Sequence, residues 1–148
     1  GLQWMTHVHD VHLQCSVHKA RVLIGNLGSP TRMKYGMLGD GVNLTARLKS
    51  LNTRYGTQLL VSSDALEHDG AADGFVCRPI GNLILKGRTT PTRTFEVLAA
   101  SRFADEALTE GAATFTRAFE LFQGRKFAEA KEQFLEGSRM LMSSDIKE

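Results

Sequence analysis

The chain has 148 residues, of which 42% are hydrophobic and 23% charged, as is ordinary for one globular domain or one domain with a small appendage. Its net charge of +2 is too small to indicate binding to nucleic acid or to a membrane surface. The sequence has no apolar run long enough to cross a bilayer and no signal peptide with a basic start and an apolar core. We expect an intracellular location on the cytoplasmic side, whether or not the longer parent is attached to the membrane.

Two strands are predicted near the N-terminus. Residues 11–17 alternate between apolar and polar side chains, as in a strand with one buried face. Residues 20–27 are predicted to form a second strand after a tight reversal, and Gly25, Gly28 and Pro30 end it in a loop. Two strands followed by a turn and a helix predict an α+β fold with an antiparallel sheet.

Four histidines lie in the first strand and before it: His7, His9, His12 and His18. His7 and His9 would share one face of a strand and would then offer two metal ligands. A structural zinc site needs four ligands, and no pattern of cysteines or carboxylates completes the set. We therefore interpret these histidines as part of the strand and its lead-in, and we assign no metal ligand in the chain.

The two cysteines, Cys15 and Cys77, lie far apart in apolar, strand-like segments. In a chain without a secretion signal, this arrangement is more typical of free thiols than of a disulfide. We therefore predict two reduced, buried cysteines.

The segment from residue 35 to residue 55 combines a strand end, a turn and a helix. Residues 35–38 form a short apolar run, and Gly39-Asp40-Gly41 then favours a tight turn in which Asp40 can cap the following helix. The helical period begins at Val42 and places four apolar side chains on one face: Leu44, Leu48, Leu51 and Tyr55. A second face carries Asn43, Arg47, Ser50 and Arg54.

Asn43 and Arg47 are the candidate binding residues on this second face. They are four positions apart, so their side chains are neighbours on the helix surface. An amide and a guanidinium held side by side near the start of a helix suit an anionic ligand that is rich in oxygen. The same spacing is typical of an ordinary amphipathic helix with a solvated polar face, and spacing alone leaves both interpretations open.

The rest of the chain is predicted to form further strands and then to become helical. Strands are predicted at residues 58–62, 75–80, 82–85 and 93–98, with a short helix at 63–67 and a basic loop at 86–88. The helical pattern begins at residue 104, and Gly124-Arg125-Lys126 separates two amphipathic helices. This helical hairpin resembles a single tetratricopeptide unit. Because such a unit cannot bury its own apolar face, we expect further repeats or a protein partner to cover it.

Together these segments resemble the catalytic domain of the class III nucleotidyl cyclases, the adenylyl and guanylyl cyclases. Residues 39–47 reproduce the family's signature, a Gly-Asp turn followed by a helix that opens Val-Asn-x-x-x-Arg. The flanking pieces occur in the family's order: a strand ending in His18, a Gly-Asn-x-Gly-Ser end at residues 25–29, Tyr55-Gly56 before the next strand, and a lysine-bearing loop at 85–88 before the closing strand at 95–97. The match runs from about residue 9 to residue 98.

The resemblance implies a fold, a reaction and a set of roles. Residues 1–100 would form the C-terminal part of a ferredoxin-like cyclase core, and residues 101–148 would form the helical hairpin and tail. The implied reaction is the formation of 3′,5′-cyclic AMP and pyrophosphate from ATP, in signal transduction, at a site shared by two cyclase domains. Arg47 would face the phosphate in the transition state, Asn43 would position the ribose, and Lys86 would neutralise the terminal phosphates.

Two departures from the family pattern limit what the resemblance implies. The two aspartates that bind Mg²⁺ or Mn²⁺ in the family lie on strands that would precede Gly1, so we expect this chain to be inactive alone and to work within a longer parent. Many adenylyl cyclases carry an acidic residue for the adenine amine where this chain has Gly36, next to Met37. Gly36 fits neither the adenylyl nor the guanylyl pattern, and we favour ATP. The alternatives are a guanylyl cyclase, or a non-catalytic module that binds nucleotide or holds a dimer and docks through its helices.

Overall fold

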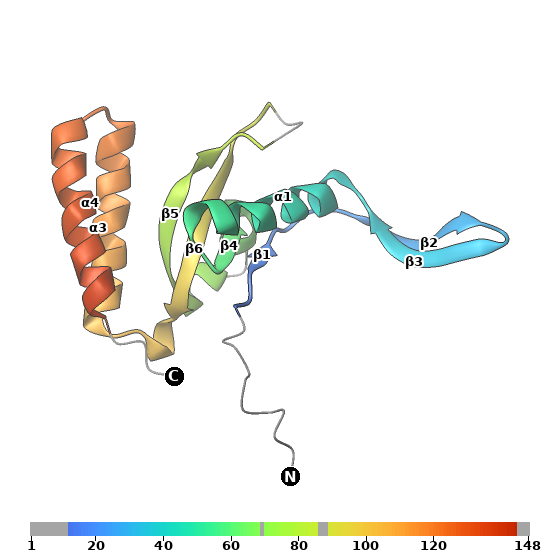
Figure 1. Cartoon of the computed structure of the whole chain (residues 1–148), viewed down its shortest axis with the longest axis horizontal. Coiled ribbons are helices and arrows are strands. Elements are labelled where there is room, and N and C mark those ends of the chain that lie inside the picture. The colour runs from blue at the N-terminus through green and yellow to red at the C-terminus, as the bar shows by residue number, and fades with distance from the viewer. Residues whose placement is uncertain (1–11, 69, 86–88, 145–148) are drawn as a thin grey trace, which may run out of the picture.

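The computed structural model of the chain describes residues 12–68, 70–85 and 89–144, which fold around a four-stranded sheet (Figure 1). The strand order is β1-β4-β6-β5, with bounds Cys15–Val17 (β1), Leu59–Ser62 (β4), Thr92–Ala100 (β6) and Phe75–Leu83 (β5). The β1–β4 pair is parallel, whereas β4–β6 and β5–β6 are antiparallel. The predicted α+β class is therefore confirmed, but the sheet is mixed rather than purely antiparallel.

Helix α1 (Asp40–Tyr55) lies along one face of this sheet. Leu44 and Leu48 are fully buried and form a core cluster with Leu85, against which Leu51 packs, so the three leucines of α1 confirm the predicted apolar face. Tyr55, the fourth predicted member, is 39% exposed, so the prediction is wrong at the last turn. The predicted cap is wrong by one position: Gly39 is the N-cap, and Asp40 is the first helical residue, where its carboxylate lies near the positive end of the helix dipole.

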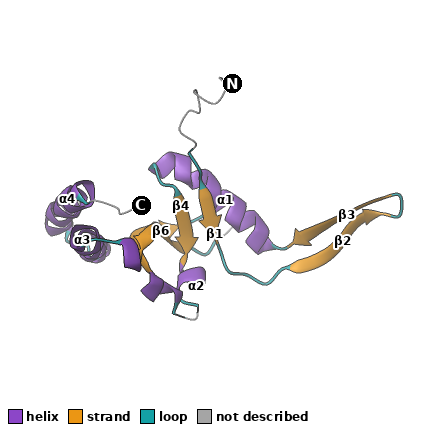
Figure 2. Ribbon diagram, turned by 90° about the horizontal axis from the view of Figure 1, so that it is seen from below, coloured by secondary structure: helices purple, strands orange, loops and turns teal. Residues whose placement is uncertain are grey.

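The first two predicted strands do not pair with each other. β2 (Leu23–Ser29) pairs in antiparallel register with β3 (Arg32–Leu38), and this two-stranded arm projects away from the sheet (Figures 1 and 2). The predicted reversal before residue 20 is therefore wrong, and the tight turn lies at residues 30–31 instead. Closing a hairpin over two residues costs less chain entropy than bringing β2 back to β1. β1 itself is shorter than predicted.

The edge strand β5 is continuous, although the sequence predicts two separate strands in its place. Two irregularities in its pairing with β6, between Val76 and Cys77 and between Pro79 and Gly81, explain the interrupted pattern. Proline has no amide hydrogen to donate, and Pro79 is tolerated because only one side of an edge strand pairs. Short helical turns fill the connections: α2 (Ser63–Leu66), η2 (Ala71–Gly74) and η3 (Ser101–Phe103).

The predicted helical hairpin is present as α3 (Glu106–Gln123) and α4 (Phe127–Ser143). Asp105 caps α3 by accepting a hydrogen bond from the amide of Leu108, at 2.7 Å. The two helices approach closely at Gly137, where a β-carbon would lie 3.2 Å from the carbonyl oxygen of Gly111. None of the helices in the described residues has the length and apolarity that a membrane crossing requires.

A stack of side chains joins the hairpin to the sheet. Arg78 of β5 pairs with Glu96 of β6, with 2.6 Å between Nε and Oε2, and its guanidinium lies 5.0 Å from the centre of the Phe115 ring of α3. Phe115 in turn meets Phe134 of α4 edge to face, with 4.9 Å between ring centres. Helix α3 therefore packs directly on the sheet through β5, and α4 packs on α3.

Both cysteines are free, as predicted, but only one is shielded from solvent. Cys15 is exposed, because it lies on the edge strand β1 and its neighbour Ser16 is the residue that faces α1. Cys77 is partly buried, and this burial raises the pKa of its thiol to about 11. The prediction that both thiols are buried is therefore wrong for Cys15.

Candidate functional site

Asn43 and Arg47 lie one turn apart on α1, to one side of its buried face. Each directly precedes a fully buried leucine, Leu44 or Leu48, so the packing of these leucines on the sheet fixes how far the helix is rotated. Asn43 is exposed and Arg47 is half-buried. The predicted side-by-side amide and guanidinium are therefore accessible to a ligand, on a helix whose orientation is set by the core.

The N-terminal end of α1 is held close to the segment that follows β1. A β-carbon on Gly41 would lie only 2.3 Å from the β-carbon of Ala20, so no larger residue fits at this position without movement. Ser16 of β1 donates a hydrogen bond from Oγ to the carbonyl oxygen of Thr45, at 2.8 Å. The hydroxyl of Thr45 donates to the carbonyl oxygen of Gly41, also at 2.8 Å. The Ser16 hydrogen bond therefore fastens α1 to β1, and the Thr45 hydrogen bond lies within the first turns of the helix.

The C-terminal half of α1 is fastened by Asn52, a residue that the sequence analysis did not single out. Asn52 is fully buried, and its side-chain amide donates to the carbonyl oxygen of Cys15 at 2.8 Å. Its own Oδ1 accepts from the hydroxyl of Thr57 at 2.7 Å. A signal was available, because Asn52 lies four positions after Leu48 and therefore falls on the apolar face. A polar residue there must find buried partners.

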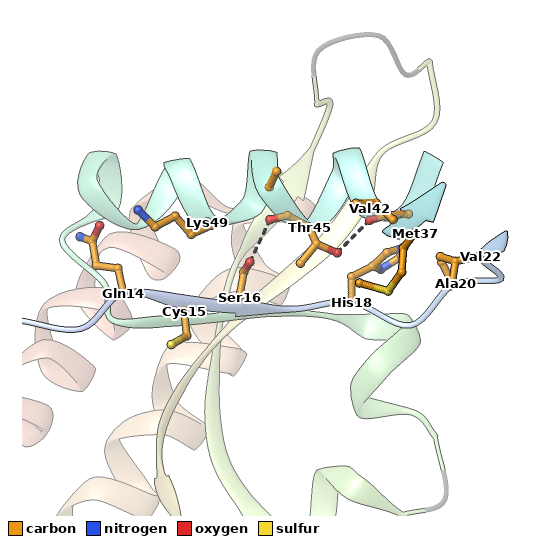
Figure 3. A pocket seen from close by; sticks show the side chains of 12 residues that line it. Gln14, Cys15, Ser16, His18, Ala20, Val22, Met37, Val42, Thr45 and Lys49 are labelled. Carbon is orange, nitrogen blue, oxygen red and sulfur yellow. Dashed lines mark hydrogen bonds between the residues drawn. The ribbon is translucent and has the colours of Figure 1, made fainter. Parts of the chain in front are cut away.

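The other side of α1 borders a groove of about 680 Å³ between the helix, β1 and the base of the arm (Figure 3). Its lining includes Ser16 and His18 from the β1 segment, Val22 and Met37 from the arm, and Thr45 and Lys49 from α1. Lys49 lies at one end of the groove and Met37 at the other. The groove is therefore mainly apolar, with a cation at one end and a histidine near the other.

His18 has a defined structural contact at this groove. Its ring is only 6% exposed, and Nδ1 lies 2.8 Å from the hydroxyl of the buried Ser62 and 3.7 Å from the carboxylate of Asp64. These contacts agree with the interpretation of His18 as a residue that holds the end of a strand. Of the other histidines, His7 and His9 lie outside the described residues. Among the described residues, no three His, Cys, Asp or Glu side chains come together in a way that could hold a metal ion.

The candidate residues named from the sequence do not all lie on one surface. Asn43 and Arg47 lie together, but neither lines the groove that Met37 helps to form. Gly36 lies opposite Gly25 in the arm, and a β-carbon on Gly36 would lie 3.2 Å from Cδ1 of Leu27. Lys86 lies outside the described residues.

Known proteins resemble this chain over part of its length. No family model matches it. Adenylate cyclase 1 of Rhizobium meliloti is 33% identical over 86 residues, which is 58% of this chain and 13% of that protein. The terminal-differentiation-specific adenylate cyclase of Dictyostelium discoideum is 30% identical over 94 residues, which is 63% of this chain and 4% of that protein.

Among solved structures, the adenylyl cyclase CyaB from P. aeruginosa is 28% identical, over 57% of this chain and 41% of that one, with a TM-score of 0.49. The sequence likeness to the two adenylate cyclases and the signature at residues 39–47 identify this chain as containing part of a class III nucleotide cyclase domain.

Proposed function

We propose that this chain supplies the asparagine–arginine half of an adenylyl cyclase active site, within a longer protein that forms 3′,5′-cyclic AMP and pyrophosphate from ATP in signal transduction. The observation that carries the proposal is the placement of Asn43 and Arg47, which are neighbours on an accessible side of α1. Both halves of that helix are fastened to β1, through Ser16 at one end and Asn52 at the other. A site with fixed charges is what stabilisation of a transition state requires.

The chemistry explains why an arginine and an asparagine are needed. The 3′-hydroxyl of the ribose attacks the α-phosphorus, a new P–O bond forms, and the bond to the leaving pyrophosphate breaks. Negative charge grows on the α-phosphoryl oxygens and on the pyrophosphate. The guanidinium of Arg47 would donate two hydrogen bonds to these oxygens while remaining charged at any working pH. The amide of Asn43 would bind the ribose and align its hydroxyl with the phosphorus.

Divalent metal chemistry is assigned to the partner domain. When bound, Mg²⁺ or Mn²⁺ would polarise the α-phosphate and activate the hydroxyl. The described residues of this chain hold no group of ligands for such an ion.

Three further residues complete the proposed substrate contacts. Lys86 would neutralise the terminal phosphates, and its described neighbour Leu85 packs against Leu44 and Leu48 of α1. Gly36 and Met37 would lie beside the base, where Gly36 offers no side chain for discrimination. We therefore propose a preference for ATP with measurable turnover of GTP, because recognition by shape alone typically discriminates by only ~10–200-fold.

The arm supports the proposal that a second cyclase domain completes the site, in a homodimer or a pseudo-heterodimer. It exposes large apolar side chains along both strands: Leu23 is 69% exposed, Ile24 53%, Met33 64%, Tyr35 71% and Met37 56%. Soluble monomers rarely expose so many large apolar side chains together, and such patches mark contact surfaces. The arm projects from the sheet, so a partner domain can reach it (Figure 2).

The test is a mixing experiment with the longer protein that carries this segment. One form carries Arg47→Ala, and a second form lacks its metal-binding aspartates. Each should be inactive as a homodimer, and mixing them should restore one working site in each heterodimer, measured as cyclic AMP formed from ATP. Arg47→Ala should lower kcat by ~100-fold or more with little change in KM. The matched control is Arg54→Ala, two turns further along the same side of α1, and it should keep its activity.

The alternatives give different results in the same assay. A heterodimer that forms but makes no product at any mixing ratio would refute the shared site. An unsubstituted longer protein that makes no cyclic nucleotide would favour a non-catalytic module that only binds nucleotide or holds a dimer. Faster turnover of GTP than of ATP would make the protein a guanylyl cyclase. A rise in KM with unchanged kcat in Arg47→Ala would move Arg47 from transition-state stabilisation to ground-state binding.

A further inference from the structure

An apolar groove runs along the helical hairpin near its turn, with a volume of about 370 Å³. Its walls include Phe122 of α3 and Phe127, Phe134 and Leu135 of α4. Phe122, Phe127 and Leu135 are each more than half exposed, at 51%, 58% and 52%. Three large apolar side chains left this open on one surface are unfavourable unless something covers them.

The shape of the surface fits a helix. Phe127, Lys131 and Leu135 follow one another at four-residue spacing along α4, and Met142, which is 87% exposed, continues the same stripe two turns later. The rings of Phe122 and Phe127 meet edge to face, with 5.6 Å between their centres, and close one end of the groove. A stripe of this length beside a second helix is the kind of groove that accepts the apolar face of an amphipathic helix.

The charges around the groove select the kind of helix. Lys131 lies within the stripe, and no carboxylate among the described residues pairs with it. Arg125, in the turn beside Phe122, also has no acidic partner among the described residues. Covering an unpaired ammonium with an apolar surface alone would cost free energy, whereas a carboxylate on the incoming helix would compensate it.

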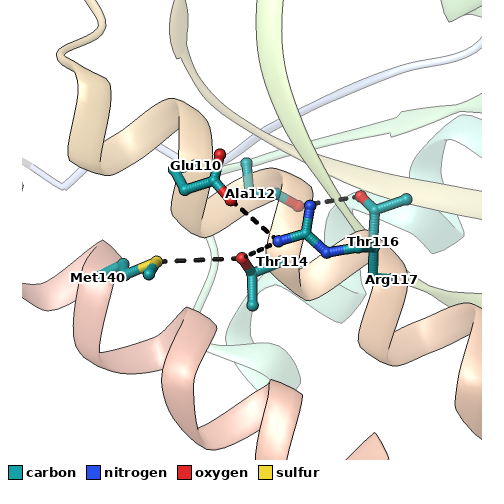
Figure 4. A network of polar contacts seen from close by, with 6 residues as sticks. All are labelled: Glu110, Ala112, Thr114, Thr116, Arg117 and Met140. Carbon is teal, nitrogen blue, oxygen red and sulfur yellow. Dashed lines mark hydrogen bonds and ion pairs between the residues drawn. The ribbon is translucent and has the colours of Figure 1, made fainter.

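The other groove of the same hairpin has a different character. Its lining includes Arg117, Glu120, Lys126, Glu129 and Glu132, so both signs of charge are present. Figure 4 shows that the charge of Arg117 is paired, because its guanidinium donates to Glu110 at 3.0 Å and also to the hydroxyl of Thr114 at 2.7 Å. Lys126 likewise pairs with Glu129. The unpaired positive charge is therefore a property of the Phe122–Leu135 groove and not of the hairpin as a whole.

We propose that the groove formed by Phe122, Phe127, Lys131 and Leu135 binds an acidic amphipathic helix of a partner protein. The helix places apolar residues against the phenylalanines and Leu135, and an aspartate or glutamate against Lys131. This inference does not depend on the proposed cyclase activity, because no residue of α1 takes part in it.

The experiment uses the 148-residue chain and a surface-displayed library of random 18-residue peptides. Selection should enrich peptides with apolar residues at helical spacing flanked by aspartate or glutamate. Synthetic forms of the enriched peptides are then titrated by fluorescence anisotropy. Lys131→Glu and Leu135→Glu should each weaken binding by roughly tenfold or more. Arg117→Glu makes the same change of charge on the other groove and should leave the affinity unchanged.

Several results would overturn the proposal. They are the absence of any enriched peptide, enrichment of basic peptides, or binding that neither Lys131→Glu nor Leu135→Glu weakens. Sedimentation velocity of the chain alone gives an independent check. A dimer that Leu135→Glu dissociates would show that a second copy of this chain occupies the groove. Far-UV circular dichroism of each variant checks that the hairpin is still folded. We expect it to be folded, because all three substituted side chains are on the surface.

Discussion

Replacing Gly41 by alanine should destabilise the chain through a single contact that a second substitution can remove. The added β-carbon would lie 2.3 Å from the β-carbon of Ala20, whereas carbon atoms in favourable contact are about 3.5–4.0 Å apart. One of the two segments must therefore move by more than about 1 Å. Gly41 belongs to the first turn of α1, so this movement would also shift Asn43 and Arg47.

The size of the effect follows from two opposing terms. Overpacking of this kind costs about 1–3 kcal/mol, while the higher helix propensity of alanine over glycine offsets up to about 1 kcal/mol. The double variant Ala20→Gly/Gly41→Ala removes the clash, because the next atoms, His18 Cδ2 and Ala20 Cα, lie at 3.6 and 3.7 Å, which is ordinary contact. The helix propensity of alanine at position 41 contributes equally with and without Ala20→Gly, so it cancels in the double-mutant cycle. The coupling energy should therefore equal the clash, about 1–3 kcal/mol.

Urea denaturation of the four proteins, followed by far-UV circular dichroism, measures this coupling energy. We expect Gly41→Ala to lower the free energy of unfolding and the added Ala20→Gly to restore it. Substitutions at independent sites usually add to within about 0.5 kcal/mol. A coupling energy below that value would refute the close approach of α1 to residue 20, and with it the anchoring of the N-terminal end of the helix.

Three further predictions concern the buried amide, the thiols and the base. Asn52→Leu should lower the free energy of unfolding by about 2–4 kcal/mol, because it leaves the partly buried carbonyl of Cys15 and the buried hydroxyl of Thr57 without their shared partner. Thr57→Val removes only one of these hydrogen bonds and should cost less, about 1–3 kcal/mol, and a larger loss for Thr57→Val than for Asn52→Leu in urea denaturation would contradict the described contacts. Iodoacetamide at pH 8 should modify exposed Cys15 well before Cys77. The pKa of Cys77 is about 11 against an ordinary 9.0, which leaves about 100-fold less thiolate. Equal rates of modification by mass spectrometry would count against the burial of Cys77. Gly36→Asp in the longer protein should raise the ratio of kcat/KM for ATP to that for GTP from ~10–200 toward ~10⁴, since a polar contact replaces recognition by shape; an unchanged ratio would move the base away from this residue.

Helix α1 could be predicted from sequence because its signals are local and agree with one another. The leucine spacing, the glycines before the helix and Gly56 after it all mark the same segment, and Gly56 adopts the left-handed conformation, with φ 64°, that ends a helix. The role of Gly41 was predicted for the wrong reason. It is needed for a close approach to Ala20, a contact between segments 21 positions apart that no local pattern encodes.

Strand pairing and the contacts of α1 were less accessible to sequence reasoning. The arm was missed because Pro30 was interpreted as the end of a strand and not as the turn of a hairpin that pairs seven residues on each side. β1 pairs with β4, more than 40 positions away, and alternation of side chains does not say which strand is the neighbour. The placement of Asn43 and Arg47 on one side of α1 followed from their spacing. The separation of that side from the groove at Met37 depends on the path of the arm, so only the structure reveals it.

The stack of Arg78, Phe115 and Phe134 determines how the chain would unfold under mechanical force or after removal of the hairpin. Composition changes near residue 100, but a cation–ring contact crosses that point, because the guanidinium of Arg78 lies over the ring of Phe115. Arg78 is held by the carboxylate of Glu96, which is 12% exposed, and Phe115 meets Phe134 edge to face within the hairpin. Removing the hairpin would open this pair of β5 and β6 side chains to water, so the sheet and the helices are expected to melt as one cooperative unit. Conversely, a force applied to α4 at Phe134 would be transmitted to β5 and β6 through directly packed side chains. The hairpin is therefore expected to move together with the sheet and not to rotate freely about the connection near residue 100.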